Sequence, residues 1–278
     1  MLTHLDQLES QSIYILREAY QAVGKLAMLW SFGKDSNVMI HLARKAFLGR
    51  VPFPLIHCDT GLEMAEVYAF RDRYVKEWGV ELISAPCPPL EKTDPTLPHA
   101  ARVAARKTLG LQQLLSERKF SGIIAGIRRD EEATRAKERV FSPRGEEGEW
   151  NAKDQPPEFW DHYNMYSKTG ASLRIHPLLH WSERDIWHYI KQESISVVPL
   201  YFAKPYHQFE GRDFSGKTMR FRSIGERGIT WPIESNAATI DEILAELAQT
   251  HTSERSGRPM GADEDESSFE RLRAGGYM

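Results

Sequence analysis

Short apolar runs alternate along the chain with longer segments whose apolar side chains recur every three to four residues. The short runs have the length of buried β-strands, and the three-to-four spacing is typical of amphipathic helices. Because strands and helices follow one another with short connections, the pattern predicts a parallel, doubly wound α/β sheet. We expect strands at residues 26–30, 53–58, 80–83 and 122–126, and helices at residues 5–23, 37–47, 63–78 and 109–118.

Two capping-box patterns mark the start of further helices in the second half of the chain. Ser182 with Asp185 begins one that reaches Lys191, and Thr239 with Glu242 begins one that reaches Gln249. Residues 141–170 lie between the last expected strand and the first of these helices. They show no periodic spacing of apolar residues and are rich in polar and aromatic side chains. A polar loop of this length is more often a functional lid or a partner surface than filler.

Polar loops follow three of the expected strands, which is where ligands bind in doubly wound sheets. Residues 31–36 (Ser-Phe-Gly-Lys-Asp-Ser) lie between a strand and a helix, where free amides and the helix dipole favour phosphate. This is not a Walker loop, since Met28 stands where the first glycine is required. Residues 57–61 (His-Cys-Asp-Thr-Gly) and 128–132 (Arg-Arg-Asp-Glu-Glu) form the other two loops.

Composition narrows the classes of protein that fit this pattern. The 278 residues suffice for one large α/β domain with an appendage, and 41% hydrophobic and 27% charged residues are ordinary for a globular chain. A net charge of -3 argues against coating of nucleic acid, so an anion site requires a local concentration of Arg and Lys. Since no apolar run approaches the ~18 residues of a membrane span, we expect neither a nucleic-acid nor a membrane partner.

The two cysteines, Cys58 and Cys87, form no Cys-x-x-Cys pair. A thiolate metal site is therefore not expected, and we predict no metal site made of protein ligands alone. With so few cysteines and a polar start that lacks a secretory leader, the sequence favours a reducing, cytoplasmic protein.

The loop at residues 31–36 has the form Ser-x-Gly-x-Asp-Ser, which resembles the PP-loop ATP pyrophosphatases and phosphoadenosine phosphosulfate reductases. Further blocks resemble the small catalytic subunits of the two-subunit sulfate adenylyltransferases, and together they cover nearly the whole chain. These blocks are residues 42–47, 52–55, 57–61, 70–73, 128–132, 135–139, 198–201, 219–222, 234–237 and 252–255. The resemblance implies an adenine nucleotide alpha hydrolase-like parallel sheet with helices on both faces over residues 1–200. A loop-rich C-terminal extension over residues 201–278 would close the site or contact a partner.

The resemblance also implies a reaction. A sulfate oxygen attacks the α-phosphorus of ATP in line and displaces pyrophosphate, which gives adenylyl sulfate. Sulfate is already an anion, so the protein needs no general base and contributes positioning and charge neutralisation. ATP is then the substrate, Mg2+ shares its negative charge, and the partner is a large GTPase subunit, because the family couples the reaction to GTP hydrolysis and this chain has no GTPase motif.

Carried onto this sequence, the resemblance implies a set of site residues. The phosphate loop would hold the β- and γ-phosphates, the loop at residues 57–61 would contact adenosine, and Arg128 and Arg129 would bring in sulfate. The catalytic candidates are Lys34, Asp35, Arg128 and Arg129, and the nucleotide-binding candidates are Ser31, Phe32, Gly33, Asp35, Ser36, His57, Asp59, Arg135 and Arg255.

Each of these groups also has a plain structural explanation. Residues 31–36 and 57–61 could be turns whose polar side chains only cap the following helices. Arg135 lies four residues after Glu131, the spacing of a solvated, ion-paired helix face that would also include Lys137. Arg255 could belong to an exposed tail of mixed charge.

Departures from the family pattern leave other functions open. Leu62 stands where the family has an aromatic residue, Phe32 replaces a smaller aliphatic one, and residues 201–219 form a shorter segment than usual. The alternatives are a divergent PP-loop adenylyltransferase with another acceptor and a non-catalytic nucleotide-binding subunit of a GTPase complex. A reductase would need a cysteine in the C-terminal tail, and none follows Cys87. A tRNA-thiolating enzyme would need paired cysteines and a basic surface, and the sequence indicates neither.

Overall fold

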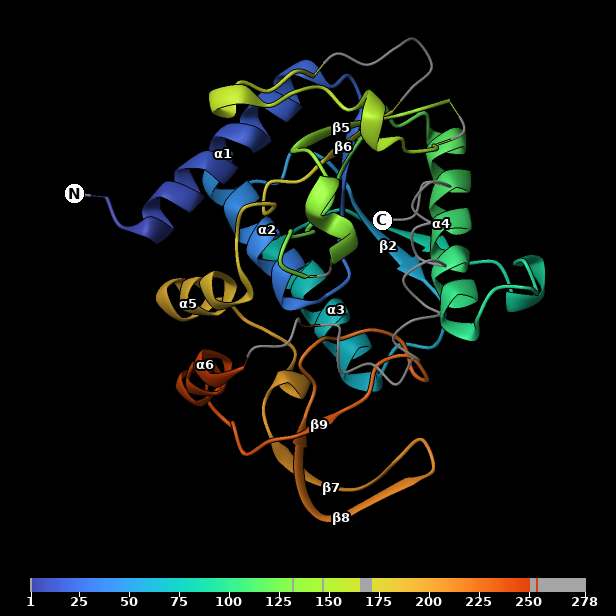
Figure 1. The fold of residues 1–278 in the computed structure, drawn as a ribbon, viewed down its shortest axis with the longest axis vertical. Coiled ribbons are helices and arrows are strands. Elements are labelled where there is room, and N and C mark those ends of the chain that lie inside the picture. Colours follow the sequence, from blue (N-terminus) through green and yellow to red (C-terminus); the bar gives the residue numbers. More distant parts are fainter. Residues whose placement is uncertain (1, 132, 147, 166–171, 251–253, 255–278) are drawn as a thin grey trace.

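The computed structural model describes residues 2–131, 133–146, 148–165, 172–250 and 254 (Figure 1). Its centre is a six-stranded sheet in the order β3-β2-β1-β4-β6-β5, in which all neighbours are parallel except the antiparallel pair β5 and β6. The strands are β1 (Leu26–Leu29), β2 (Leu55–Asp59), β3 (Leu82–Pro86), β4 (Gly122–Ile124), β5 (Phe141–Arg144) and β6 (Ser172–Ile175). The predicted doubly wound sheet is confirmed, with one antiparallel strand added at its edge.

Helices cover both faces of this sheet (Figure 1). Successive strand residues point to opposite faces, so Ala27 and Ile123 pack with α4 while Met28 and Ile124 join the larger core on the other side. That larger core also contains buried residues of α1, α2, α3, α5 and α6. The helices are α1 (His4–Ala22), α2 (Lys34–Ala46), α3 (Ala65–Trp78), α4 (His99–Arg118), α5 (Glu183–Glu193) and α6 (Ile240–Gln249).

The strand order places a topological switch point between β1 and β4. From β1 the chain moves outward through β2 to β3, and then returns to pair β4 with the opposite side of β1. Parallel pairing of Met28 with Ile124 brings the carboxyl ends of β1 and β4 to the same level. Ligands of doubly wound sheets bind in the crevice at such a point, so the loops after these two strands mark the site.

Two expected boundaries were wrong for physical reasons. The helix expected at residues 109–118 begins ten residues earlier, at His99, because the alanine-rich turn that precedes Leu109 favours helix and buries Ala101 and Val103. The third strand runs from Leu82 through Pro86, whereas we expected it to end at residue 83. Proline is tolerated there because β3 is an edge strand of the sheet.

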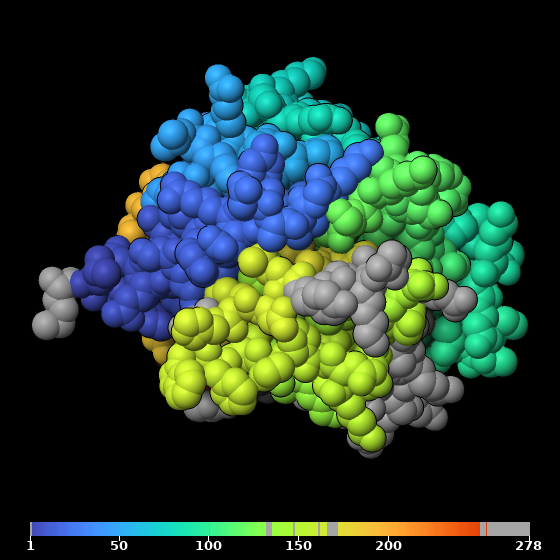
Figure 2. Space-filling view, turned by 90° about the horizontal axis from the view of Figure 1, so that it is seen from above, coloured from blue at the N-terminus to red at the C-terminus, as the bar shows by residue number. Residues whose placement is uncertain are grey.

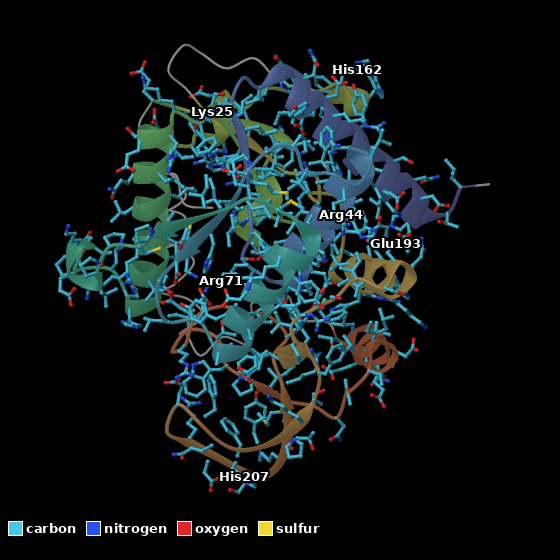
Figure 3. All side chains as sticks on the ribbon, turned by 180° about the vertical axis from the view of Figure 1, so that it is seen from behind. Lys25, Arg44, Arg71, His162, Glu193 and His207 are labelled. Atoms are coloured by element: carbon cyan, nitrogen blue, oxygen red, sulfur yellow. The ribbon has the colours of Figure 1, made fainter. Side chains whose placement is uncertain are left out.

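The C-terminal part has more regular structure than the loop-rich extension we expected. A second, antiparallel sheet contains β7 (Lys204–Phe209), β8 (Arg212–Arg220) and β9 (Ile233–Glu234). Both residues of the turn between β7 and β8, Glu210 and Gly211, have left-handed backbones, which suits a two-residue hairpin. In Figure 3, His207 of β7 lies at the opposite end of the molecule from Lys25, just before β1.

The aperiodic segment expected at residues 141–170 supplies the edge strand β5 and two short 3-10 helices, Ala152–Asp154 and Phe159–Asp161. Tyr163 accepts a hydrogen bond from Gln11 of α1 at 3.1 Å, and Figure 2 shows the yellow-green segment against the blue N-terminal part. Residues 166–171 lie outside the described residues. No helix in the described part of the chain is long and apolar enough to cross a membrane.

Candidate functional site

The phosphate loop begins where β1 ends, and it turns through a left-handed backbone at Phe32 (φ 61°). This conformation costs a non-glycine residue roughly 1–2 kcal/mol. The Phe32 ring is fully buried, with ring centroids 4.5 Å from Trp30 and 4.6 Å from His57, and this packing stabilises the turn. Phe32 can therefore reach a ligand only through its backbone.

The serines of the loop hold its own backbone together. Ser36 Oγ donates to the carbonyl of Gly33 at 2.9 Å and lies 3.3 Å from Ser31 Oγ. A Cβ at Gly33 would lie 3.4 Å from the hydroxyl of Tyr201, so the glycine leaves room for that hydroxyl. The serines thus brace the turn, but neither caps the helix, because the N-cap residue is Gly33 and the helix start receives no side-chain cap hydrogen bond.

Helix α2 begins inside the loop at Lys34, three residues before the start we expected. The first amides of a helix have no intrahelical acceptor. The Lys34 amide donates to Tyr201 Oη at 2.9 Å, which leaves the amides of Asp35 and Ser36 directed toward a ligand at the positive end of the helix dipole. Tyr201 lies in the block at residues 198–201 that resembles the family, but no local pattern indicated that its hydroxyl reaches the phosphate loop.

A buried cluster of charges lies against this helix start. The Lys34 ammonium is 3.2 Å from Asp35 Oδ2 and 2.5 Å from Glu254 Oε1. The Arg128 guanidinium donates to Asp130 at 2.9 Å and to Glu254 Oε2 at 2.6 Å, and it also contacts Asp35. The strand-end loops after β1 and β4 therefore converge, as the sequence predicted for Lys34, Asp35 and Arg128.

Glu254 is the residue that sequence reasoning missed. Its side chain is 6% exposed, and although burial alone would raise its pKa, Lys34 and Arg128 hold that pKa far below the usual range. Glu254 belongs to the block at residues 252–255 that resembles the family, but only Arg255 of that block was predicted as a site residue. Arg255 itself lies outside the described residues.

The second loop brings His57 and Asp59 to the neighbouring strand end. Burial lowers the pKa of His57 to about 4, so its ring is neutral near pH 7, with Nδ1 4.0 Å from Asp59 Oδ2. Burial opposes ionisation of Asp59, but hydrogen bonds from the Gly61 amide (2.9 Å) and the Tyr68 hydroxyl (3.0 Å) keep its pKa low. Asp59 thus shapes its turn and remains partly exposed beside the crevice.

The side chains of Arg128 and Arg129 lie in different surroundings, whereas we expected both to bind sulfate. The backbone turns at these residues, since the Glu131 amide donates to the Arg128 carbonyl at 3.4 Å, and the Arg129 amide donates to the Leu179 carbonyl at 3.2 Å. The Arg129 guanidinium donates to Glu138 O at 3.0 Å and lies 3.4 Å from His180 Nδ1. It lines a separate cavity of about 270 Å³ with Arg139, Pro157, Glu158, Phe159, Tyr163 and His180.

Arg135 is 1% exposed, so the solvated helix face proposed as its alternative is wrong for this residue, whereas Lys137 is exposed. It lies in the buried surroundings of His176, whose pKa burial lowers to about 4. Nearby, Arg144 donates to Glu138 at 3.1 Å.

Fold and site together define an α/β nucleotide-binding protein whose phosphate loop lies at the β1/β4 switch point. Residues 25–232 match the phosphoadenosine phosphosulfate reductase domain family. The chain is 42% identical over 298 aligned residues to sulfate adenylyltransferase subunit 2 of Serratia proteamaculans and to that of Yersinia pestis, with 100% of this chain and 98% of each relative covered.

The chain therefore belongs to the sulfate adenylyltransferase subunit 2 family within the reductase-domain group, and is an ATP-using nucleotidyltransferase. Candida glabrata FMN adenylyltransferase in complex with ATP has a similar fold, with a TM-score of 0.54 at 16% identity over 97% of this chain and 80% of that one. The subunit 2 name implies a partner subunit.

Proposed function

We propose that this protein is the catalytic subunit of a sulfate adenylyltransferase, which converts ATP and sulfate into adenylyl sulfate and pyrophosphate. The observation that carries the proposal is the pairing of Lys34 and Arg128 at the amino end of α2, inside the switch-point crevice. Cations and free amides at this point favour the anion that develops as pyrophosphate departs.

The phosphate loop holds the β- and γ-phosphates in this proposal. The amides of Asp35 and Ser36 donate to phosphate oxygens, and the Lys34 and Arg128 side chains neutralise the leaving diphosphate. Sulfate attacks the α-phosphorus from the opposite side, and the P–O bond to the pyrophosphate breaks as the new S–O–P bridge forms. Neither step moves a proton, so positioning and electrostatics account for the catalysis.

His57 and Asp59 contact adenosine. Because the pKa of His57 is lowered to about 4, its neutral ring adds no charge beside the base or ribose. Asp59 keeps its negative charge and its partial exposure, so its Oδ2, which lies 3.5 Å from the Arg71 guanidinium, can also accept a hydrogen bond from a ribose hydroxyl.

We assign sulfate binding to the cavity that Arg129 lines. Arg129 and Arg139 bring two guanidinium groups to it, and each presents donors that can fork onto an oxyanion. Arg128 is then a phosphate ligand, so the two arginines bind different groups, whereas the resemblance implied that both bind sulfate. Arg135 and Arg255 stay predicted nucleotide contacts.

Mg2+ fits the proposed nucleotide site only if protein carboxylates and substrate phosphates bind it together. No cluster of three or more His, Cys, Asp or Glu among the described residues is arranged to hold a metal ion. Mg2+ is commonly bound by one or two carboxylates together with substrate phosphates, and Asp35 and Asp130 are the carboxylates at the loop that fit this role. Bound there, the ion would neutralise phosphate charge.

We further propose that the partner is a GTPase large subunit and that the segment 141–165 contributes to its docking surface. On this segment Phe159 is 67% exposed and Trp160 is 90% exposed, which is unusual for side chains of this size.

Residues 1–200 form the nucleotide-binding domain, and residues 201–278 close the site, as the contacts of Tyr201 and Glu254 with the loop suggest. The unpaired Cys58 and Cys87 suit a cytoplasmic setting.

The test is sulfate-dependent release of pyrophosphate from ATP, measured with the chain alone and with a candidate GTPase subunit and GTP. Arg129→Ala should raise the KM for sulfate while leaving ATP binding intact, whereas Asp35→Asn should impair ATP binding and turnover together. Arg73→Ala, at an exposed position on α3, is the matched arginine control. Turnover that survives both site variants would refute the assignment, and ATP binding without any sulfate-dependent release would favour another acceptor or a non-catalytic role.

A further inference from the structure

Among the described residues, the charged side chains at the phosphate loop carry no net positive charge. Two cations, Lys34 and Arg128, face three carboxylates, those of Asp35, Asp130 and Glu254. The cluster therefore has a net charge of about -1 when all five groups are ionised. The triphosphate of ATP must either enter against this charge or replace one of the carboxylates.

Two of the three carboxylates are built into the local framework. Asp35 belongs to the first turn of α2, next to Lys34. Asp130 lies two residues after Arg128 and accepts a hydrogen bond from the Glu183 amide at 2.7 Å, which ties it to the start of α5. Neither can leave without disturbing a helix start.

Glu254 is different, because it comes from a position 220 residues beyond Lys34. Its two oxygens lie 2.5 Å from the Lys34 ammonium and 2.6 Å from the Arg128 guanidinium. Two oxygens of one phosphate can bridge the same pair of cations, because Arg and Lys bind carboxylates and phosphates alike. Glu254 thus has the place and the charge of a substrate phosphate.

The chain keeps this carboxylate near the loop when it is not bound. Helix α6 ends at Gln249, five residues before Glu254, and is anchored by the buried Ile243 and Leu247. Five residues span at most roughly 17 Å, so a displaced Glu254 remains at high effective concentration.

We propose that the Glu254 carboxylate is an internal competitor of the substrate phosphates: it occupies the position of an ATP phosphate on Lys34 and Arg128 and exchanges with it. The proposal rests on the proposed role of the phosphate loop in binding ATP. It has a direct consequence for turnover, because Glu254 stabilises the empty loop and returns as pyrophosphate leaves. Because ATP and pyrophosphate must both displace the Glu254 carboxylate, the exchange lowers the affinity of the loop for each of them.

Calorimetric titration of the full chain with inorganic pyrophosphate and with MgATP tests the exchange. Glu254→Gln keeps the shape of the side chain and an acceptor for Lys34 but removes the charge, so pyrophosphate should bind roughly tenfold more tightly, a factor worth about 1.4 kcal/mol. Glu254→Ala should show the same direction. Asp241→Asn on α6 removes one negative charge from an exposed side chain away from the loop and should leave the affinity unchanged.

Steady-state kinetics with the partner subunit give a second readout. Glu254→Gln should lower the KM for ATP and strengthen inhibition by pyrophosphate, with kcat kept or reduced through slower product release. Unchanged or weaker pyrophosphate binding in both folded Glu254 variants, checked by thermal unfolding, would overturn the exchange while leaving the proposed function intact. If the unaltered chain binds neither pyrophosphate nor MgATP, the proposed function fails as well.

Discussion

Replacing Arg128 by lysine tests whether one guanidinium organises the site. Arg128 is 1% exposed, and its three nitrogens reach Asp35, Asp130 and Glu254. A lysine ammonium keeps the charge but is a single point that can satisfy one of these carboxylates.

The structure sets the size of the effect. Each hydrogen bond to a charged group is worth about 1.5–3 kcal/mol, and Arg128→Lys gives up two of three. The loss is moderated because the side chain of Asp130 is 39% exposed and can be hydrated, so we expect destabilisation of roughly 3 kcal/mol. For a chain of this size that corresponds to a fall in Tm of roughly 6–12 °C.

The assay is urea unfolding together with pyrophosphate titration of the same preparation. Arg129→Lys is the matched control, since the neighbouring guanidinium is half-buried, bonds to the Glu138 carbonyl and His180 Nδ1, and pairs with none of the three carboxylates of the cluster. We expect it to cost about 1 kcal/mol and to leave pyrophosphate affinity unchanged. If Arg128→Lys and Arg129→Lys prove equal in both measurements, Arg128 does not organise the loop.

Three further predictions follow from other contacts. Burial keeps the pKa of His176 at about 4 in the folded chain, against about 6.5 unfolded, so the unfolded state binds more protons between these values. Its contribution is complete above pH 6.5 and is lost as the pH falls, by roughly 2 kcal/mol between pH 7 and 5; His176→Asn should flatten the urea-derived stability profile over that interval. Tyr201→Phe removes the acceptor of the Lys34 amide and should cost about 1–3 kcal/mol in the same unfolding assay. Trp160→Ser with Phe159→Ser should weaken binding to the partner subunit, measured by ultracentrifugation, without lowering Tm.

Each of these has a clear contrary result. A stability profile of the His176 variant that parallels that of the unaltered chain would show that its ring is not held neutral. A Tyr201→Phe chain as stable as the parent would mean that water takes over the amide. Undiminished assembly of the double aromatic variant would move the partner surface away from residues 159–160.

Periodicity and strand-end position predicted most of the framework and three of the five charged groups of the cluster, those of Lys34, Asp35 and Arg128. The alternation of strands and helices is encoded locally, so the loops after β1 and β4 could be found and their convergence inferred from topology alone. The directions of side chains within those loops could not be predicted, because the two adjacent arginines were treated as a pair, although the turn after β4 directs Arg128 to Glu254 and Arg129 to the Glu138 carbonyl.

Long-range contacts are the other part that local patterns miss. Tyr201 and Glu254 meet Lys34 across 167 and 220 residues, and no spacing rule connects positions so far apart. The β7–β8 hairpin was also missed, since its strands are largely exposed and lack the apolar alternation that identifies a half-buried strand.

The two outer strands of the central sheet restrict how other chains can join it. β3 contains Pro86 and β5 contains Pro143, and proline has no N–H to donate to an added strand. A sheet with a proline on each border resists both edge-to-edge aggregation and extension by a strand from another protein. A second subunit that meets these two borders is therefore expected to contact them through side chains rather than as an added strand, and fusion or display there should not seed polymerisation.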